Sequence, residues 1–314
     1  MQPKTDRITL RNNREQIQNM LMQLVLHPRR DFIRWAKITK QTPNMKIGYP
    51  GQHLASLITG MEGERTGARG NDLCDGSEVK SCSRIDQLDK CKDCDAAVAR
   101  IEPTCPQCHS TSIQRNHDSK WLFAIKSEKE LQFLLDQVPR VVLILADCPN
   151  FDQEDWDTIQ FQAFEIWPKH ERHKHFRTLM TNYFNDIYLP HIQKNAKKTP
   201  APKNFWPYSF QSYMCNPILT FHCVITHANA EPSIDIKTCV EPERNRADIN
   251  PVMMPLDVLI PDERKKILEH MDPSARRSVE ERGLNEEQRV RLSLRDTDHA
   301  TPQSSTYRRG VRSY

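Results

Sequence analysis

Two groups of residues lie close together in the chain and have side chains that could do chemistry. The first group is acidic and ends in a lysine: Asp72 is followed by Asp75 and then by Glu78-Val79-Lys80. The second group is four cysteines in two pairs, Cys91-x2-Cys94 and Cys105-x2-Cys108. Carboxylates are ligands for hard cations such as Mg²⁺, whereas thiolates are ligands for Zn²⁺. The sequence therefore offers one candidate site for each kind of metal.

The acidic group is expected on a β-hairpin that turns at Asp75-Gly76. With a three-residue turn, Asp72 shares one face with Glu78 and Lys80, because strand neighbours two apart point the same way. Asp72, Glu78 and the Val79 carbonyl could then bind Mg²⁺, while Lys80 orients or deprotonates a water molecule. A two-residue turn would place Asp72 on the opposite face, so the sequence leaves this register open.

Charged residues before the hairpin could assist such a site. Glu64 or Glu62 could supply a further carboxylate near the metal ligands, and Arg65 and Arg69 are placed to contact phosphates. The alternative interpretation is a surface hairpin whose charges face water. The chain also holds a second acid-x-lysine pattern, Asp235-Ile236-Lys237, so the pattern alone does not identify a catalytic site.

The four cysteines have the spacing of a closed structural zinc site, in which each pair holds one side of a tetrahedral ion. Residues 87–118 lack apolar periodicity, so zinc binding would stabilise a segment too polar to form its own core. Free thiols, disulfides and an iron–sulfur cluster are the alternatives. Basic residues that flank the pairs leave contact with DNA open: Lys90, Lys92, Arg100, Arg115 and Lys120.

The composition sets broader limits. A chain of 314 residues with a net charge of +4 can bury a sizeable core, but the charge alone indicates no nucleic-acid partner. No apolar run of transmembrane length and no signal-peptide core is present, so we expect a cytoplasmic protein without a membrane. No phosphate-binding glycine-rich motif is present either, so we expect no nucleotide cofactor.

The pattern of apolar residues predicts the elements around these sites. Two helices are expected over residues 11–37, separated at Pro28, and a short helix near 51–60. A strand at 121–125, a helix opened by Ser127 and a buried strand at 141–146 predict a parallel crossover unit. With the cysteine segment set aside, residues 50–147 give the order helix, strand, strand, strand, helix, strand.

The second half is less regular. Residues 159–164 begin a strand or a helix, 173–192 form a helix with His173 on a solvated basic face, and two strands follow at 218–226 and 234–240. Short helices at 262–294 are expected to pack rather than to bind DNA. We expect three regions, namely helical residues 1–46, an α/β core at 47–150 with the zinc-binding insertion 87–118, and a recognition or dimerisation region at 151–314.

The acidic segment resembles a known signature. Residues 67–72 (Gly-Ala-Arg-Gly-Asn-Asp) and 75–81 (Asp-Gly-Ser-Glu-Val-Lys-Ser) are similar to the metal-binding motif of the PD-(D/E)xK nuclease superfamily. Asp72 matches its first acid, Glu78 its second acid and Lys80 its lysine. Asn71 stands where the signature often has proline, and the gap between the acids is unusually short, so Asp75 remains an alternative first ligand. The core of that superfamily resembles the element order derived above.

Over most of its length the chain is similar to the MamI-type family of type II restriction endonucleases, with specific motifs within residues 47–125. This resemblance implies Mg²⁺-dependent, sequence-specific cleavage of double-stranded DNA, with a 3′-hydroxyl product. It also implies a homodimer acting at a short, interrupted palindrome. Two rival hypotheses remain: a non-catalytic zinc-ribbon DNA-binding protein, and a His-Asn-His nuclease built on Asn116-His117, which would need a strand leading into a helix there.

Overall fold

The computed structural model describes residues 1–11, 13–65, 71–195, 202–207, 209, 211–212 and 215–249. Arg69, the glycine-rich segment before Asn71 and the expected helices at 262–294 lie outside these residues. Within the described ranges, no helix is both long enough and apolar enough to cross a membrane.

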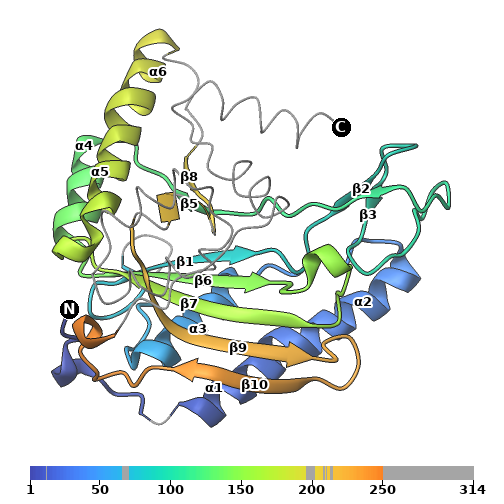
Figure 1. Cartoon of the computed structure of the whole chain (residues 1–314), viewed down its shortest axis with the longest axis horizontal. Coiled ribbons are helices and arrows are strands. Elements are labelled where there is room, and N and C mark those ends of the chain that lie inside the picture. The colour runs from blue at the N-terminus through green and yellow to red at the C-terminus, as the bar shows by residue number, and fades with distance from the viewer. Residues whose placement is uncertain are drawn as a thin grey trace, which may run out of the picture.

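The centre of the molecule is a five-stranded sheet with the strand order β1-β6-β7-β9-β10 (Figure 1). β1 and β6 are parallel, and every other neighbouring pair is antiparallel. Because β1 stands first in the strand order, it forms one edge of the sheet. The strands are β1 (Glu78–Ser83), β6 (Val141–Asp147), β7 (Ile159–Ile166), β9 (Ile218–Thr226) and β10 (Ser233–Cys239).

The N-terminal helices lie on one side of this sheet (Figure 1). Alternate residues of β6 point to this side, namely Val142, Ile144 and Ala146, because side chains of a strand alternate between its two faces. They share a core with apolar side chains of the helices, including Ile17, Leu21, Leu54 and Ile58. The helices are α1 (Arg14–Leu21), a π-helical segment (Met22–Leu26), α2 (His27–Thr39) and α3 (Gly48–Thr59).

The expected break at Pro28 is wrong, because α1, the π-helical segment and α2 follow one another without an interruption. Pro28 lies in the first turn of α2, directly after the π-helical segment. The π-helical turn directly before it changes the hydrogen-bond pattern of the helix where Pro28 lacks an N–H group, so the rod continues through the proline. The apolar run on both sides of Pro28 thus belongs to one helical rod.

The other face of the sheet carries a second core, formed by Val141, Leu143 and Leu145 of β6 with α4, α5 and a small sheet. In that small sheet, β5 (Trp121–Phe123) pairs antiparallel with β8 (Lys203–Phe205). The indole N–H of Trp121 donates to the Ile144 carbonyl at 2.9 Å and so ties β5 to β6. The helices are α4 (Glu128–Gln132) with the π-helical segment Phe133–Gln137, and α5 (Lys174–Asn182), the π-helical segment Tyr183–Tyr188 and α6 (Leu189–Lys194).

The short elements complete the described chain. The cysteine-rich insertion forms a three-stranded sheet, β3-β2-β4, built from β2 (Asp89–Cys91), β3 (Ala97–Val98) and β4 (Ile113–Gln114). Among the residues that the structure describes, 3-10 turns lie at Thr5–Arg7, Phe151–Gln153, Glu171–His173 and Arg246–Asp248. The insertion extends from one end of the main sheet in Figure 1.

Several sequence predictions are confirmed: the helix near 51–60, the strands at 78–80, 121–125 and 141–146, and the two strands of β9 and β10. Residues 159–166 are a strand. Two further predictions are wrong. Residues 72–74 form only an isolated bridge with Gly63, and the parallel partner of β6 is β1 rather than the strand at 121–123, which pairs with β8 instead. The main sheet also takes strands from both sides of residue 150.

Candidate active site and metal centre

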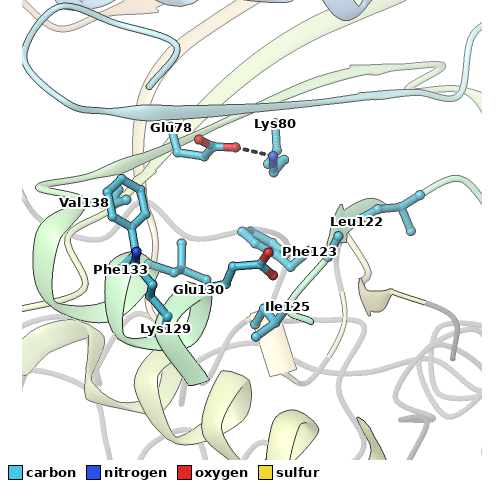
Figure 2. A pocket seen from close by; sticks show the side chains of 11 residues that line it. Glu78, Lys80, Leu122, Phe123, Ile125, Lys129, Glu130, Phe133 and Val138 are labelled. Carbon is cyan, nitrogen blue, oxygen red and sulfur yellow. Dashed lines mark hydrogen bonds and ion pairs between the residues drawn. The ribbon is translucent and has the colours of Figure 1, made fainter. Parts of the chain in front are cut away.

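Glu78 and Lys80 lie on β1, at the free edge of the main sheet. They point away from the N-terminal helices, since Val79 between them is buried against the core that α3 shares. Lys80 Nζ forms an ion pair with Glu78 Oε1, and both side chains line one wall of a pocket (Figure 2). The pair therefore lies on the face of β1 that is turned toward α4 and β5.

The pocket beneath this pair has a volume of about 350 Å³. Its other walls are mainly apolar, and Lys129 and Glu130 of α4 lie opposite Glu78 and Lys80 (Figure 2). Glu130 accepts a hydrogen bond from the Lys126 N–H at 2.7 Å, while Ser127 caps the helix through the Glu130 N–H. The apolar lining is Leu122, Phe123, Ala124, Ile125, Phe133, Leu134 and Val138.

Asp72 reaches the same edge by a route that the sequence did not predict. The Ser77 carbonyl accepts hydrogen bonds from the N–H groups of both Asp72, at 3.1 Å, and Leu73, at 3.2 Å. The Gly76 N–H donates to the Leu73 carbonyl, and Gly76 has a φ of 92°, which favours glycine. The chain thus turns too tightly for the two-stranded ladder assumed in either expected register.

The Asp72 carboxylate is held at the free edge of β1. Its Oδ2 accepts the Val79 N–H at 2.7 Å, and its Oδ1 accepts Nε2 of Gln52 in α3, also at 2.7 Å. The N–H and C=O groups of one strand residue point to the same edge, so the Val79 carbonyl faces the side on which Asp72 lies. Asp72 therefore lies beside β1 because its side chain bonds to the strand edge, and not because its backbone pairs with β1.

Electrostatics also connect Asp72 with the pair on β1. Burial raises the pKa of Asp72, and the nearby charge of Glu78 adds to the rise. The Val79 N–H, the charge of Lys80 and the Gln52 amide act in the opposite direction. Two neighbouring carboxylates repel each other, so a cation shared between them would be stabilised there. The structure thus brings Asp72, Glu78 and Lys80 together.

Asp75 has a different environment. Its carboxylate forms a buried ion pair with Arg140, 2.7 Å between Oδ2 and Nη2, and accepts the Ser77 N–H at 3.0 Å. Arg140 also donates to Ser77 Oγ at 2.9 Å and lies near the buried Glu165. These bonds fix the turn that carries Asp72, and they occupy the Asp75 carboxylate.

The remaining residues expected at this site lie around it or are not described. The Glu64 N–H donates to the Asp72 carbonyl at 2.9 Å, but the side chains of Glu62, Glu64 and Arg65 are exposed. Arg69 lies outside the described residues. Sequence reasoning missed Gln52 and Arg140. Gly51 at the start of the expected helix was a signal for close packing near Gln52, because glycine weakens a helix and often has a packing reason there.

The four cysteines converge as their spacing predicts. Their sulfur atoms all lie within 4.8 Å of one another, and the pairs Cys91–Cys108 and Cys94–Cys105 are each 3.5 Å apart. Zinc–sulfur bonds of about 2.3 Å in a tetrahedron put sulfur atoms about 3.8 Å apart, so the cluster fits zinc. Backbone N–H groups of Cys108 and Gln107 lower the pKa of Cys105 to about 7, whereas the pKa values of Cys94 and Cys108 are raised, with hydrogen bonds to the other thiols among the causes. In the absence of a metal the thiolate is therefore favoured at Cys105 rather than over the whole cluster.

The two cysteine pairs have the same local backbone. The N–H group four residues after the first cysteine donates to that cysteine's carbonyl: Asp95 to Cys91 at 3.1 Å, and His109 to Cys105 at 3.0 Å. Asp95 and His109 both have left-handed φ angles, 62° and 61°. Each pair therefore sits on the same tight turn, which presents both of its thiols to one point.

Two of the basic residues that flank the cysteines are not available to phosphates. Arg100 and Arg115 both form ion pairs with the buried Asp89, at 3.1 and 2.9 Å. The guanidinium of Arg100 also lies over the rings of Phe151 and Trp156, which follow β6. These arginines hold the insertion against the connection between β6 and β7, so neither guanidinium is left for a phosphate.

The Asn116-His117 hypothesis does not fit the fold. Both residues follow β4 and precede β5, so no helix comes after them. The Asn116 N–H donates to Asp89 at 2.7 Å, and His117 lies 3.4 Å from Asp147 at the end of β6. The strand-to-helix geometry that a His-Asn-His nuclease requires is absent at this position.

Comparison with known proteins gives the family. Residues 34–257 match the MamI restriction endonuclease family, which is more than half of the chain. The chain belongs to this family. A stretch of 74 residues is also 35% identical to the type II restriction enzyme MamI of Microbacterium ammoniaphilum, and it covers 24% of each chain. The chain thus spans about a quarter of the length of this curated relative. No solved structure matches the chain.

The MamI family range contains every part of the two candidate sites. It includes α3 with Gln52, the turn from Asp72 to Ser77, β1 and the four cysteines, and it continues through all strands of the main sheet. The range begins at Arg34 within α2, so α1 and the start of α2 lie outside it. The family match therefore corresponds to the sheet, its edge site and the insertion.

Proposed function

We propose that this chain is a Mg²⁺-dependent endonuclease that hydrolyses double-stranded DNA at a specific sequence. The observation that carries the proposal is the position of the Asp72 carboxylate, at the free edge of β1 beside the Glu78–Lys80 ion pair. A free sheet edge with two acids and one amine suits a phosphodiester substrate. Membership of a restriction endonuclease family supports the same activity.

The donor set fits a hard cation. Asp72 and Glu78 offer carboxylate oxygens and Val79 offers a carbonyl oxygen, which are the ligands that Mg²⁺ prefers. Asp75 is a poorer first ligand, because Arg140 and the Ser77 N–H already occupy its carboxylate. When bound, Mg²⁺ would supply positive charge at the scissile phosphate.

Residues of the chain would position and activate the attacking water. Glu78 holds Lys80 at the wall of the pocket, where its ammonium would orient the attacking water or its neutral amine would accept the proton of that water. The water oxygen would form a bond to phosphorus while the bond to the 3′-oxygen breaks; the 3′-oxygen would take the bonding electrons and a proton from solvent water, which leaves a 3′-hydroxyl and a 5′-phosphate. No covalent intermediate with the protein is required.

Further features are proposals that rest on the family resemblance. The parallel pair β1 and β6, joined through α4, supports a PD-(D/E)xK-like core over residues 47–150. A homodimer on an interrupted palindrome, in the cytoplasm, would match a type II restriction enzyme. Residues 151–314 would then serve recognition or dimerisation, and Zn²⁺ would stabilise the insertion at 87–118.

Cleavage of a supercoiled plasmid tests this function. We expect cutting by the wild-type protein with Mg²⁺, none with a chelator, and none by Glu78→Ala even though that variant still binds DNA. Mapping the fragment ends would identify the recognised bases. A folded protein that binds DNA but never cuts it, over many plasmid sequences, would contradict the proposal and favour a non-catalytic zinc protein.

A further inference from the structure

Gln52 of α3 contacts the Asp72 carboxylate at the edge of β1. Its side-chain amide reaches from α3 to the edge of β1 and donates to Oδ1 of Asp72 at 2.7 Å. The other oxygen, Oδ2, accepts the Val79 N–H at the same distance. One donor on each oxygen fixes both the position and the plane of the carboxylate. Each oxygen keeps a further lone pair that can face a cation.

Gly51, the residue before Gln52, allows α3 to lie close to β1. A Cβ atom at Gly51 would lie 2.0 Å from Ser81 Oγ and 3.0 Å from Ser81 Cβ, so only glycine allows α3 to approach β1 this closely. A glycine within a helix lowers its stability relative to alanine. The close approach at Gly51 thus brings the next residue of α3, Gln52, to Asp72.

We propose that Gln52 is a positioning residue that holds the Asp72 carboxylate in the orientation in which it binds the metal ion. This role rests on the proposed function, because it requires Asp72 to be a ligand. Without the amide, one of the two bonds that orient the carboxylate is lost, and the carboxylate can rotate about its Cβ–Cγ bond. Loss of a hydrogen bond to a metal ligand typically weakens metal affinity or activity about 10- to 100-fold.

The test compares two equivalent substitutions in the full-length protein. Gln52→Met keeps the length and helix propensity of the side chain but removes the donor. Gln16→Met makes the same change at an exposed position of α1 and is the matched control. Binding of Mn²⁺, measured by electron paramagnetic resonance, reports the site without requiring cleavage.

We expect Gln52→Met to weaken Mn²⁺ binding about tenfold or more, and Gln16→Met to leave it unchanged. The Mg²⁺ concentration for half-maximal cleavage should rise in parallel, whereas the rate at saturating Mg²⁺ should fall less. Gln52→Asn keeps an amide on a shorter side chain that cannot reach Asp72, so it should show the same loss. It serves as a second variant if Gln52→Met does not fold.

Wild-type affinity for Mn²⁺ in a folded Gln52→Met protein would overturn the positioning role. Failure of the proposed function would look different: Asp72→Asn would then leave Mn²⁺ affinity unchanged, or the wild-type protein would bind no Mn²⁺ at all. In that case Asp72 is not a ligand, and the role of Gln52 fails with it.

Discussion

At the scale of single residues, the chain contains two acid-x-lysine patterns on strands, and their surroundings differ. Glu78 and Lys80 have 20% and 29% of their side chains exposed, whereas Asp235 and Lys237 on β10 have 62% and 52%. Both patterns form an internal ion pair. Only the first has a further carboxylate, Asp72, held against its strand. The acid-x-lysine pattern alone therefore does not identify the site; the lower exposure of the pair and the neighbouring Asp72 carboxylate do.

This difference gives a matched pair of variants. Lys80→Met should lower the rate of DNA cleavage about 10²- to 10⁴-fold, the range for loss of a group that moves or positions a proton. Lys237→Met removes the equivalent amine from β10 and should leave the rate near that of the wild type. Single-turnover cleavage at saturating Mg²⁺ measures both. Equal losses in the two variants would argue against a special role for Lys80.

At the scale of elements, local patterns were predictable and long-range pairing was not. The cysteine cluster follows from two short motifs, since each Cys-x2-Cys turn places its own thiols. The turn from Asp72 to Ser77 was mispredicted. The Ser77 carbonyl accepts the N–H groups of both Asp72 and Leu73, and the Asp72 side chain bonds to Gln52, twenty residues earlier. The strand at 121–123 was found, but its partner β8 is some eighty residues away, and apolar periodicity does not encode that pairing.

The insertion provides a test at this scale. Purified wild-type protein should contain a single zinc ion per chain, and Cys105→Ser should lose it, because oxygen is a poorer zinc ligand than thiolate in such sites. The variant should also unfold at a lower temperature, since metal binding stabilises the segment. Cys239→Ser on β10 is the control and should retain zinc. Metal analysis and thermal unfolding decide the outcome, and unchanged zinc content in Cys105→Ser would contradict the assignment.

At the scale of the whole molecule, buried polar groups connect distant segments around the sheet. Glu165 of β7 lies between Arg140 and Arg246, and both arginines hold its pKa down despite burial. His173 was expected on a solvated helix face, which is wrong: it is fully buried, and its Nδ1–H donates to the Cys215 carbonyl at 2.9 Å. Periodicity placed the helix correctly but could not tell which of its polar residues face the core.

Burial of His173 predicts a dependence of stability on pH. Burial lowers its pKa to about 3, whereas an unfolded histidine has a pKa of about 6.5. Between these values the unfolded chain binds a proton that the folded chain excludes, so stability falls as pH falls, by about 1.4 kcal/mol per pH unit. From pH 6.5 to 5 this amounts to about 2 kcal/mol.

Urea unfolding of the wild type and of His173→Gln, at pH 7 and at pH 5, checks this prediction. The variant lacks the group that titrates, so its stability relative to the wild type should improve by about 2 kcal/mol at pH 5. Other acidic groups affect both proteins alike and cancel in the difference. The same stability difference at both pH values would show that His173 is not buried in its neutral form.

The central claim is that Asp72, Glu78 and the Val79 carbonyl surround one hard cation at the edge of β1, with Lys80 beside it. A crystal of the protein grown with Mn²⁺ and a DNA duplex that it recognises tests this most directly, because manganese gives an anomalous scattering peak. We predict a peak bound by the carboxylates of Asp72 and Glu78, next to a DNA phosphate. A DNA complex with Mn²⁺ bound elsewhere and none between these two acids would contradict the account.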